Sequence, residues 1–330
     1  MSRTQNLATW LHAHLPGEPF TLAPASEDAS FRSYLRVTSA AGTRIVMDAP
    51  PEHEDCRPFV QIARLLRDAG VHVPEIIAED LDNGYLLLSD LGTTTYLQAL
   101  TEASAPDLYA DANQALLRIQ LASRAGILPE YDRELLLREM RLFPDWYVAR
   151  HQGVTLTAAQ TQSLAAVFEI ILANNLAQPR VFVHRDYHSR NLMMSEPNPG
   201  ILDFQDAVFG PITYDLASLY KDAYIAWDEE HIVDWVVRYW EQARKAQLPV
   251  NPDFGAFYRD FEWMGVQRHI KILGIFARLS HRDGKHRYLA DMPLVMNHLR
   301  AACKRYGELW PLYRLLAELQ DQQPATGYGF

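Results

Sequence analysis

The sequence predicts an α+β chain with a small sheet-rich part, residues 1–92, followed by a larger and mainly helical part, residues 93–330. Before Gly92, short runs of strand-forming residues alternate with turn residues, whereas after Gly92 apolar residues recur at helical spacing. A third observation is that residues 181–206, inside the helical part, alternate short apolar runs with polar loops that contain Asp, Asn and His. A chain of 330 residues is long enough for one domain of two lobes, or for two domains.

Before Gly92 we expect an antiparallel sheet with one helix. Runs of β-branched and aromatic residues predict the strands, which lie within 20–47 (around a polar loop at 26–30), 76–78 and 85–88. Residues 55–69 predict the helix, because apolar residues recur there every three or four positions and Gly70 supplies a stop. Residues 1–17 predict a further short helix that ends at Pro16-Gly17.

After Gly92 the apolar pattern predicts helices. Residues 108–119 and 164–172 both carry apolar side chains at helical spacing. The second of these segments follows a capping box formed by Thr157 and Gln160. Beyond Tyr214 the chain is again mainly helical and rich in Trp and Tyr.

The segments VFVHRDYHSRN (181–191) and GILDFQD (200–206) carry the chemistry. Asp186, Asn191 and Asp203 have the order and spacing of a kinase catalytic loop and its metal-binding strand. Phosphoryl transfer needs an acceptor for the proton of the substrate hydroxyl, and oxygen ligands for Mg²⁺. A strand, loop, strand, turn, strand order predicts that these three side chains meet at one end of a small hairpin. We therefore expect Asp186 to be the catalytic base, and Asn191 and Asp203 to bind the metal.

Neighbouring polar residues have more than one interpretation. Arg190 is predicted to neutralise phosphate charge, with pairing to a structural acid as the alternative. Asp206 either contacts substrate or a second metal shell, or caps the next turn. Asp215 is interpreted as structural, bonding backbone groups of the catalytic loop, and His184 as a buried hydrogen-bonded residue of that loop.

Composition excludes several classes of function. A net charge of −10 argues against non-specific binding to nucleic acid or to an anionic membrane. No apolar run approaches the ~20 residues that cross a bilayer, and the N-terminus lacks the apolar core of a signal peptide. The two cysteines, Cys56 and Cys303, indicate a reducing compartment. We expect a cytoplasmic protein without an obligate protein partner.

The two catalytic segments resemble the aminoglycoside phosphotransferase superfamily, which includes choline kinases and other small-molecule kinases. Four further strings resemble the bacterial N-acetylmuramate/N-acetylglucosamine anomeric kinases: SEDASFRSYLR (26–36), VMDAPP (46–51), QDAVFGPITYDLASL (205–219) and HIKILGIFARL (269–279). The resemblance implies a bilobal, protein-kinase-like fold, with a nucleotide-binding lobe at 1–92 that ends in a hinge and a catalytic, sugar-binding lobe at 93–330. It also implies ATP and Mg²⁺ as cofactors, and transfer of phosphate to the 1-hydroxyl of the sugar in peptidoglycan recycling.

The sequence departs from this resemblance where ATP phosphates are held. The loop 26–30 contains no glycine, and the third strand, RIVMD (44–48), contains no lysine. The first lysine of the chain is Lys221. The candidate phosphate-binding residues are Arg32, Arg36, Arg44 and the backbone at Ser30, and Ser89 and Leu91 are the hinge candidates. Either an arginine replaces the lysine, or the protein is a nucleotide-binding pseudokinase with a regulatory role.

The acceptor site is predicted from residue types alone. Besides Asp206, the substrate candidates are Trp227, Arg268 and His269, since aromatic rings stack on sugars and basic groups bind hydroxyls or a lactyl carboxylate. Most aromatic residues of this kind pack in cores instead.

Two alternatives remain open. An aminoglycoside acceptor would favour the carboxylates of the segment 222–230, which are Asp222, Asp228, Glu229 and Glu230. A metal-dependent hydrolase would use His184, Asp186 and His188 as ligands.

Overall fold

A computed structural model describes residues 2–17, 19–26 and 31–321 of the chain. Their contacts divide the chain into two compact units. Unit 1 comprises Met1–Ile119 together with Arg190–Asp206, and unit 2 comprises Gln120–Ser189 together with Ala207–Phe330. The functional boundary that the sequence predicts at residue 92 stays a prediction.

Unit 1 contains a five-stranded antiparallel sheet, as the sequence predicts. The strand order is β1-β2-β3-β5-β4. The strands are β1 (Phe20–Ser26), β2 (Ser33–Ser39), β3 (Gly42–Asp48), β4 (Ile76–Asp80) and β5 (Tyr85–Ser89). The turn into β5 requires Gly84, whose φ is +72° and whose added Cβ would lie 1.9 Å from the carbonyl oxygen of Ala49.

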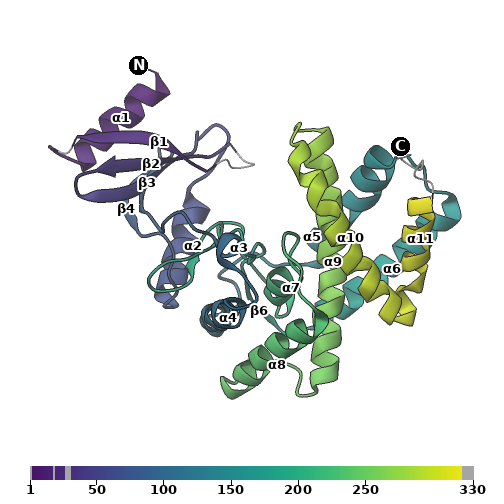
Figure 1. Ribbon diagram of the computed structural model, residues 1–330. Coiled ribbons are helices and arrows are strands. Elements are labelled where there is room, and N and C mark those ends of the chain that lie inside the picture. Colours follow the sequence, from purple (N-terminus) through teal and green to yellow (C-terminus); the bar gives the residue numbers. More distant parts are fainter. Residues whose placement is uncertain (1, 18, 27–30, 322–330) are drawn as a thin grey trace. The chain divides into compact units, whose positions relative to one another are not determined.

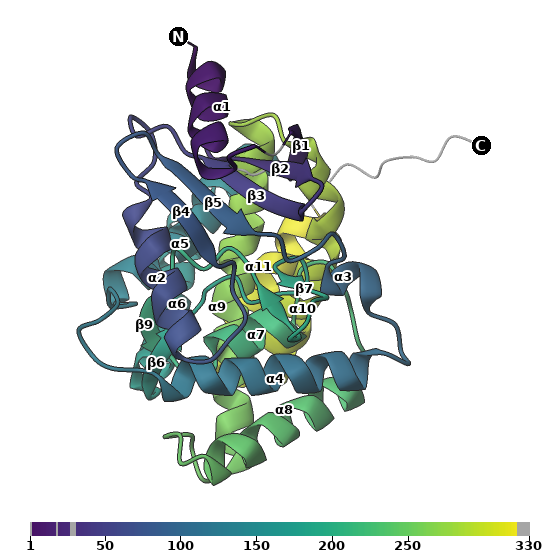
Figure 2. The same ribbon diagram turned by 90° about the vertical axis from the view of Figure 1, so that its left-hand side faces the viewer.

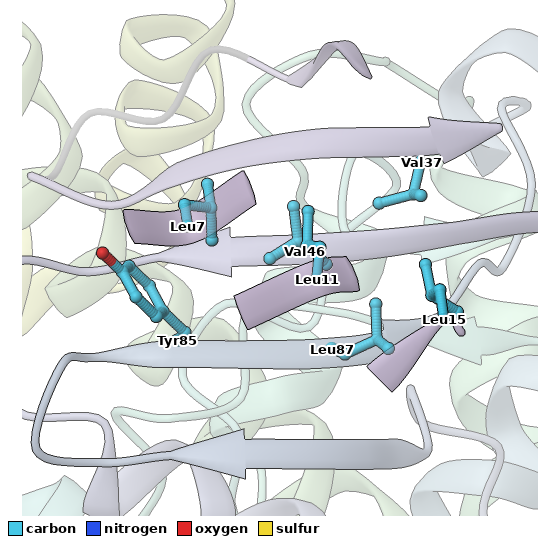
Figure 3. Packing of buried hydrophobic residues seen from close by; sticks show 7 residues of the cluster. All are labelled: Leu7, Leu11, Leu15, Val37, Val46, Tyr85 and Leu87. Carbon is cyan, nitrogen blue, oxygen red and sulfur yellow. The ribbon is translucent and has the colours of Figure 1, made fainter. Parts of the chain in front are cut away.

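Helix α1 (Arg3–His14) covers one face of this sheet. It begins with a capping box between Ser2 and Gln5. The cluster that joins it to the sheet consists of Leu7, Leu11, Leu15, Val37, Val46, Tyr85 and Leu87 (Figure 3). Helix α2 (Arg57–Asp68) lies on the other side of the sheet (Figures 1 and 2). The sequence predicted both helices but assigned only α2 to the sheet, because α1 carries a narrow apolar stripe.

The segment 190–206 belongs to unit 1 through a short strand pair, β7 (Leu192–Met193) with β8 (Gly200–Ile201). The backbone N–H of Ile201 donates to the carbonyl of His72 at 2.8 Å, and that of Met194 donates to the carbonyl of Thr94 at 2.9 Å. Unit 1 also contains α3 (Tyr96–Ala99) and most of α4 (Ala105–Leu121).

Unit 2 is built around the long helix α9 (Phe254–His281), which Figure 1 shows among its neighbours. The elements that pack on it are α5 (Arg133–Leu142), the π-helix η1 (Phe143–His151), α6 (Ala158–Ala177), α7 (Tyr214–Tyr220), α8 (Glu229–Lys245), the 3₁₀ helix η2 (His286–Asp291) and α10 (Met292–Arg305). The 3₁₀ helix η3 (Gly307–Leu309) and α11 (Trp310–Asp321) follow α10. The predicted capping box at the start of α6 is present. Among the described helices, none is long and apolar enough to cross a membrane.

The strands around the catalytic segment differ from the predicted hairpin. β6 (Arg180–Val183) pairs with β9 (Val208–Pro211), not with the segment at 192–194. The predicted strand at 201–204 ends at Ile201, because Asp203 adopts a left-handed conformation with φ +63°. Sequence spacing indicated the strands but not their partners.

Candidate active site

Asp186 lies in unit 2, in the loop after β6, and Asp215 at the start of α7 holds the backbone of the two residues before Asp186. The buried carboxylate of Asp215 accepts hydrogen bonds from the backbone N–H of His184 at 2.7 Å and of Arg185 at 3.0 Å. Burial raises the pKa of Asp215 to about 7, although these two donors oppose the shift. The predicted structural role of Asp215 is confirmed. His184 is buried, and its Nδ1 accepts from the N–H of Asp186 at 3.3 Å, also as predicted.

The carboxylate of Asp186 is surrounded by positive charge. Its side chain is 40% exposed, and Nη2 of Arg268 lies 3.5 Å from its Oδ1. Partial loss of hydration raises the pKa of Asp186, but Lys271, Arg268, His188 and Arg185 together lower it by more, so the pKa lies well below the ordinary value. Asp186 is therefore ionised at neutral pH, the state that a proton acceptor requires.

A second layer of buried charges lies behind this loop. Glu139 of α5 pairs with the guanidinium of Arg185 and with Nζ of Lys271, which is 3.2 Å away. The hydroxyl of Tyr131 donates to the same carboxylate. Nζ of Lys271 also donates to the hydroxyl of Tyr214 at 3.0 Å. Nothing local in the sequence indicated Glu139, Lys271 or the two tyrosines, because they come from four separate segments.

The far end of the catalytic loop is held by Asp222. Its carboxylate accepts from both the backbone N–H and the hydroxyl of Ser189, at 3.0 and 2.5 Å. The preceding residue, Lys221, pairs with the buried Glu262 at 3.0 Å. Its carbonyl lies 2.9 Å from Nε2 of His269. Both ends of the loop are therefore held by side chains from other elements.

Asn191 and Asp203 come together in unit 1, as predicted. Nδ2 of Asn191 lies 3.2 Å from Oδ2 of Asp203, and Nε2 of Gln205 donates to Oδ1 of Asp203 at 2.8 Å. Asp203 is exposed and adopts the left-handed conformation, a strained geometry that is frequent at functional sites. A carboxylate and an amide side by side are oxygen donors that fit Mg²⁺. Asp186 belongs to the other unit, so the meeting of all three residues stays a prediction.

The three candidate arginines of unit 1 have different surroundings. The guanidinium of Arg36 donates to Asp90 at 2.6 and 3.1 Å and to the carbonyl of Gly92 at 2.9 Å. Arg32 lies 3.7 Å from the carboxylate of Glu54, and both side chains are mostly buried. Arg44 and Val46 are two residues apart in β3, so their side chains point to the same face of the sheet. Val46 packs against α1, and Arg44 therefore lies on the α1 face. The predicted contact at Ser30 lies outside the described residues.

The two hinge candidates are close to the sheet and to β8. Oγ of Ser89 accepts from the backbone N–H of Glu75 at 2.8 Å. Leu91 is buried, and its Cδ1 would lie 2.9 Å from a Cβ added to Gly200. Gly200 therefore permits the close approach of β8 to the end of the sheet.

The substrate candidates have different surroundings within their own units. Trp227 packs edge-on against Trp235, with ring centroids 5.4 Å apart. Asp206 is exposed in unit 1, as is Arg190. Arg268 and His269 are only 4% and 1% exposed.

The carboxylates predicted for an aminoglycoside are partly engaged elsewhere. Asp222 is buried against Ser189, and Glu229 pairs with Arg305. No group of three or more His, Cys, Asp or Glu side chains that would hold a metal occurs within residues 2–17, 19–26 and 31–321.

Comparison with known proteins identifies the family. The model of the family described as "Phosphotransferase enzyme family" matches residues 21–250. The chain belongs to this family. It is an enzyme that transfers phosphate to a hydroxyl acceptor, and this decides against the hydrolase alternative.

Similar proteins extend this identification over nearly the whole chain. A protein of Pseudomonas aeruginosa named N-acetylmuramate/N-acetylglucosamine kinase is 51% identical over 328 residues, covering 96% of this chain and 97% of that protein. A solved structure of a choline/ethanolamine kinase family protein from Mesorhizobium loti has a TM-score of 0.64 and 15% identity, covering 96% of this chain and 100% of the other. Aminoglycoside phosphotransferase APH(2'')-Ib, solved with ADP bound, has a TM-score of 0.59 and 12% identity, covering 89% and 97%. The predicted kinase-like fold is confirmed.

Proposed function

We propose that this phosphotransferase uses ATP and Mg²⁺ to phosphorylate the anomeric hydroxyl of N-acetylmuramate and N-acetylglucosamine, in the cytoplasm, during peptidoglycan recycling. The observation that carries the proposal is the 51% identity, over nearly the full length, to a kinase named for these two sugars. The ionised carboxylate of Asp186 and the Asn191–Asp203 pair support phosphoryl transfer. They also argue against the pseudokinase alternative.

The proposed reaction assigns a role to each of these groups. Asp186 accepts the proton of the sugar hydroxyl as its oxygen bonds to the γ-phosphorus, while the bond between that phosphorus and the β-phosphate oxygen breaks and ADP leaves. Asn191 and Asp203 would hold Mg²⁺, which neutralises charge on the phosphates. Asp215 and Asp222 keep the ends of the catalytic loop in place.

We further propose that Arg32 supplies the cation that other kinases supply with a lysine. In protein kinases that lysine is held by a glutamate of the first large helix. Arg32 is held by Glu54, which lies three residues before α2. The bonds from Arg36 to Asp90 and Gly92, and the position of Arg44 on the α1 face, make these two arginines weaker candidates.

The experiment that tests the proposed function is an ADP-release assay with a panel of acceptors. N-acetylmuramate and N-acetylglucosamine should give Mg²⁺-dependent turnover, which EDTA abolishes. Aminoglycosides, choline and homoserine should give rates at least about a hundredfold lower in kcat/KM, which corresponds to roughly 2.7 kcal/mol of discrimination. Binding of ATP without turnover of any acceptor would instead support the pseudokinase.

A further inference from the structure

Two buried cations of α9 point to a role in the catalytic loop that the sequence did not predict. Arg268 and Lys271 are three residues apart, so they lie on one face of the helix. They are only 4% and 5% exposed. Burial of a cation is unfavourable unless partners compensate for its lost hydration. The partners of both residues therefore indicate what they do.

Arg268 contacts the catalytic loop twice. Its Nη1 donates to the carbonyl oxygen of Arg185 at 2.6 Å, and its Nη2 lies 3.5 Å from the carboxylate of Asp186. Arg185 has φ +76°, a left-handed conformation that is unfavourable for a residue with a side chain. Asp215 holds the N–H of Arg185, while Arg268 holds its carbonyl. The strained residue directly before the base is thus fixed on both sides.

Lys271 reaches the catalytic loop through other side chains. Its Nζ lies 3.2 Å from Oε1 of Glu139 and 3.0 Å from the hydroxyl of Tyr214. The same oxygen of Glu139 accepts from the guanidinium of Arg185. Tyr214 also lies 3.3 Å from Nη1 of Arg268, so the two cations share it. Lys271 therefore reaches the loop through Glu139 and Tyr214.

The charged groups around Asp186 come from three elements. Arg268 and Lys271 lie on α9, Arg185 and His188 lie in the same loop as Asp186, and the negative Asp215 lies at the start of α7. Arg268 and Lys271 are the positive members of this set that lie outside the loop. Their removal leaves the loop sequence intact, so their effect on the base is separable from that of the loop itself.

We propose that Arg268 and Lys271 are positioning residues of the phosphoryl transfer, which orient the carboxylate of Asp186 through the backbone and side chain of Arg185. The inference rests on the proposed function, and it assigns Arg268 a role other than sugar binding. A residue that binds the sugar contributes mainly to the affinity for the sugar. A positioning residue contributes mainly to the rate of the chemical step.

The test compares Arg268→Met, Arg268→Lys and Lys271→Met with the surface variant Arg238→Met. Because misplacement of a catalytic group by about 1 Å costs about a hundredfold in rate, Arg268→Met should lower kcat about a hundredfold. KM for sugar and ATP should change less than about threefold, and Lys271→Met should lower kcat about tenfold. Arg268→Lys keeps the cation and should recover part of the loss. Arg238 is exposed and pairs only along its own helix with Asp234 within the described contacts, so its replacement should be neutral.

Two results would overturn the proposal. A rise of more than about tenfold in KM for the sugar, with kcat unchanged, would make Arg268 a sugar ligand. A kcat within about twofold of the wild type, in both Arg268 variants and in Lys271→Met, would remove any role in the reaction. If Arg268→Met does not fold, as judged by circular dichroism, the same two criteria apply to Arg268→Lys and Lys271→Met.

A second measurement works without turnover and so separates this inference from the proposed function. ¹³C-labelled aspartate carboxyls are titrated by NMR, and the Asp186 signal is assigned by its absence in Asp186→Asn. In Arg268→Met and Arg268→Lys the signal should shift and titrate at higher pH than in the wild type. An unchanged signal and titration would overturn the inference even if the sugar assignment is right. A wild type inactive on both sugars, with the shift observed, would overturn only the sugar assignment.

Discussion

Asp186 is a carboxylate whose negative charge depends on cations from elsewhere in the chain. Partial loss of hydration alone would raise its pKa, and Lys271, Arg268, His188 and Arg185 keep the pKa well below the ordinary value. The carboxylate is therefore ionised over the whole neutral range, as the proposed role of a base requires. Its replacement should affect the chemistry far more than the binding of nucleotide.

Asp186→Asn should lower kcat by about a thousandfold, because an amide cannot accept the proton and positioned bases contribute roughly 10²–10⁴ in rate. The affinity for ATP should stay within about threefold. Single-turnover assays and calorimetric titration with an ATP analogue measure the two quantities. Activity within tenfold of the wild type would mean that another group is the base.

Lys271→Met should move the acid limb of the pH–rate profile to higher pH. In the wild type the low pKa of Asp186 keeps the base ionised, so kcat falls only when the pH drops below the ordinary aspartate range. Loss of a nearby cation raises that pKa, and the protonated, inactive form then appears at higher pH. A profile that keeps the wild-type acid limb would contradict the role of Lys271.

At the scale of single residues, the sequence predicted the groups that lie within the segments 181–191 and 200–206. The spacing of Asp186, Asn191 and Asp203 predicted the reaction, and Asp215 was correctly interpreted as structural. Arg268 was assigned to the sugar from its residue type, and this stays a prediction; the contacts of its guanidinium with the catalytic loop were not foreseen. Glu139, Lys271 and Tyr214 meet only through long-range contacts, which leave no local pattern in the sequence.

Helix α9 packs so closely against α5 that a glycine is required where they meet. A Cβ added to Gly274 would lie 2.4 Å from the carbonyl carbon of Leu142, the last residue of α5. The packing of α9 against α5 therefore depends on the absence of a side chain at Gly274.

Gly274→Ala should lower the free energy of unfolding by about 1–3 kcal/mol, because overpacking outweighs the gain in helix propensity of up to about 1 kcal/mol. Gly307→Ala is the matched control. Gly307 is exposed, its added Cβ would meet nothing within 4 Å, and its φ is not left-handed. Chemical denaturation measures both variants. Equal stability of the two would show that α9 and α5 separate at little cost.

The proposal that Arg32, and not Arg44, contacts the phosphates predicts different effects of replacing each. Arg32→Met should weaken ATP binding by about tenfold or more, since a charged hydrogen bond contributes about 1.5–3 kcal/mol. Arg44→Met should weaken it less than about threefold, because Arg44 lies on the face that α1 covers. Calorimetric titration measures both affinities. A larger loss of ATP affinity in Arg44→Met than in Arg32→Met would identify Arg44 as the phosphate contact.

Elements were easier to predict than their partners. The five strands of unit 1 follow from runs of strand-forming residues and turns, and the capping box of Thr157 and Gln160 marks the start of α6. Periodicity does not specify which strands pair, so the pairing of β6 with β9 was missed. The place of α1 on the sheet depends on Leu7, Leu11 and Leu15, whose fully buried partners, Val37, Val46, Tyr85 and Leu87, lie more than twenty residues further along the chain.

At the scale of the whole molecule, the residues proposed for catalysis come from both units. The proposed base Asp186 belongs to unit 2, whereas Asn191, Asp203 and the candidate arginines belong to unit 1. The family match at residues 21–250 likewise spans parts of both.

The central claim is the identity of the phosphorylated hydroxyl. The most direct test is ³¹P NMR of the product formed from N-acetylmuramate, ATP and Mg²⁺ by the full chain. The account predicts a phosphorus signal coupled to the anomeric proton, formed together with ADP and absent with Asp186→Asn. A product with phosphate at another hydroxyl, or ADP without any sugar phosphate, would contradict it.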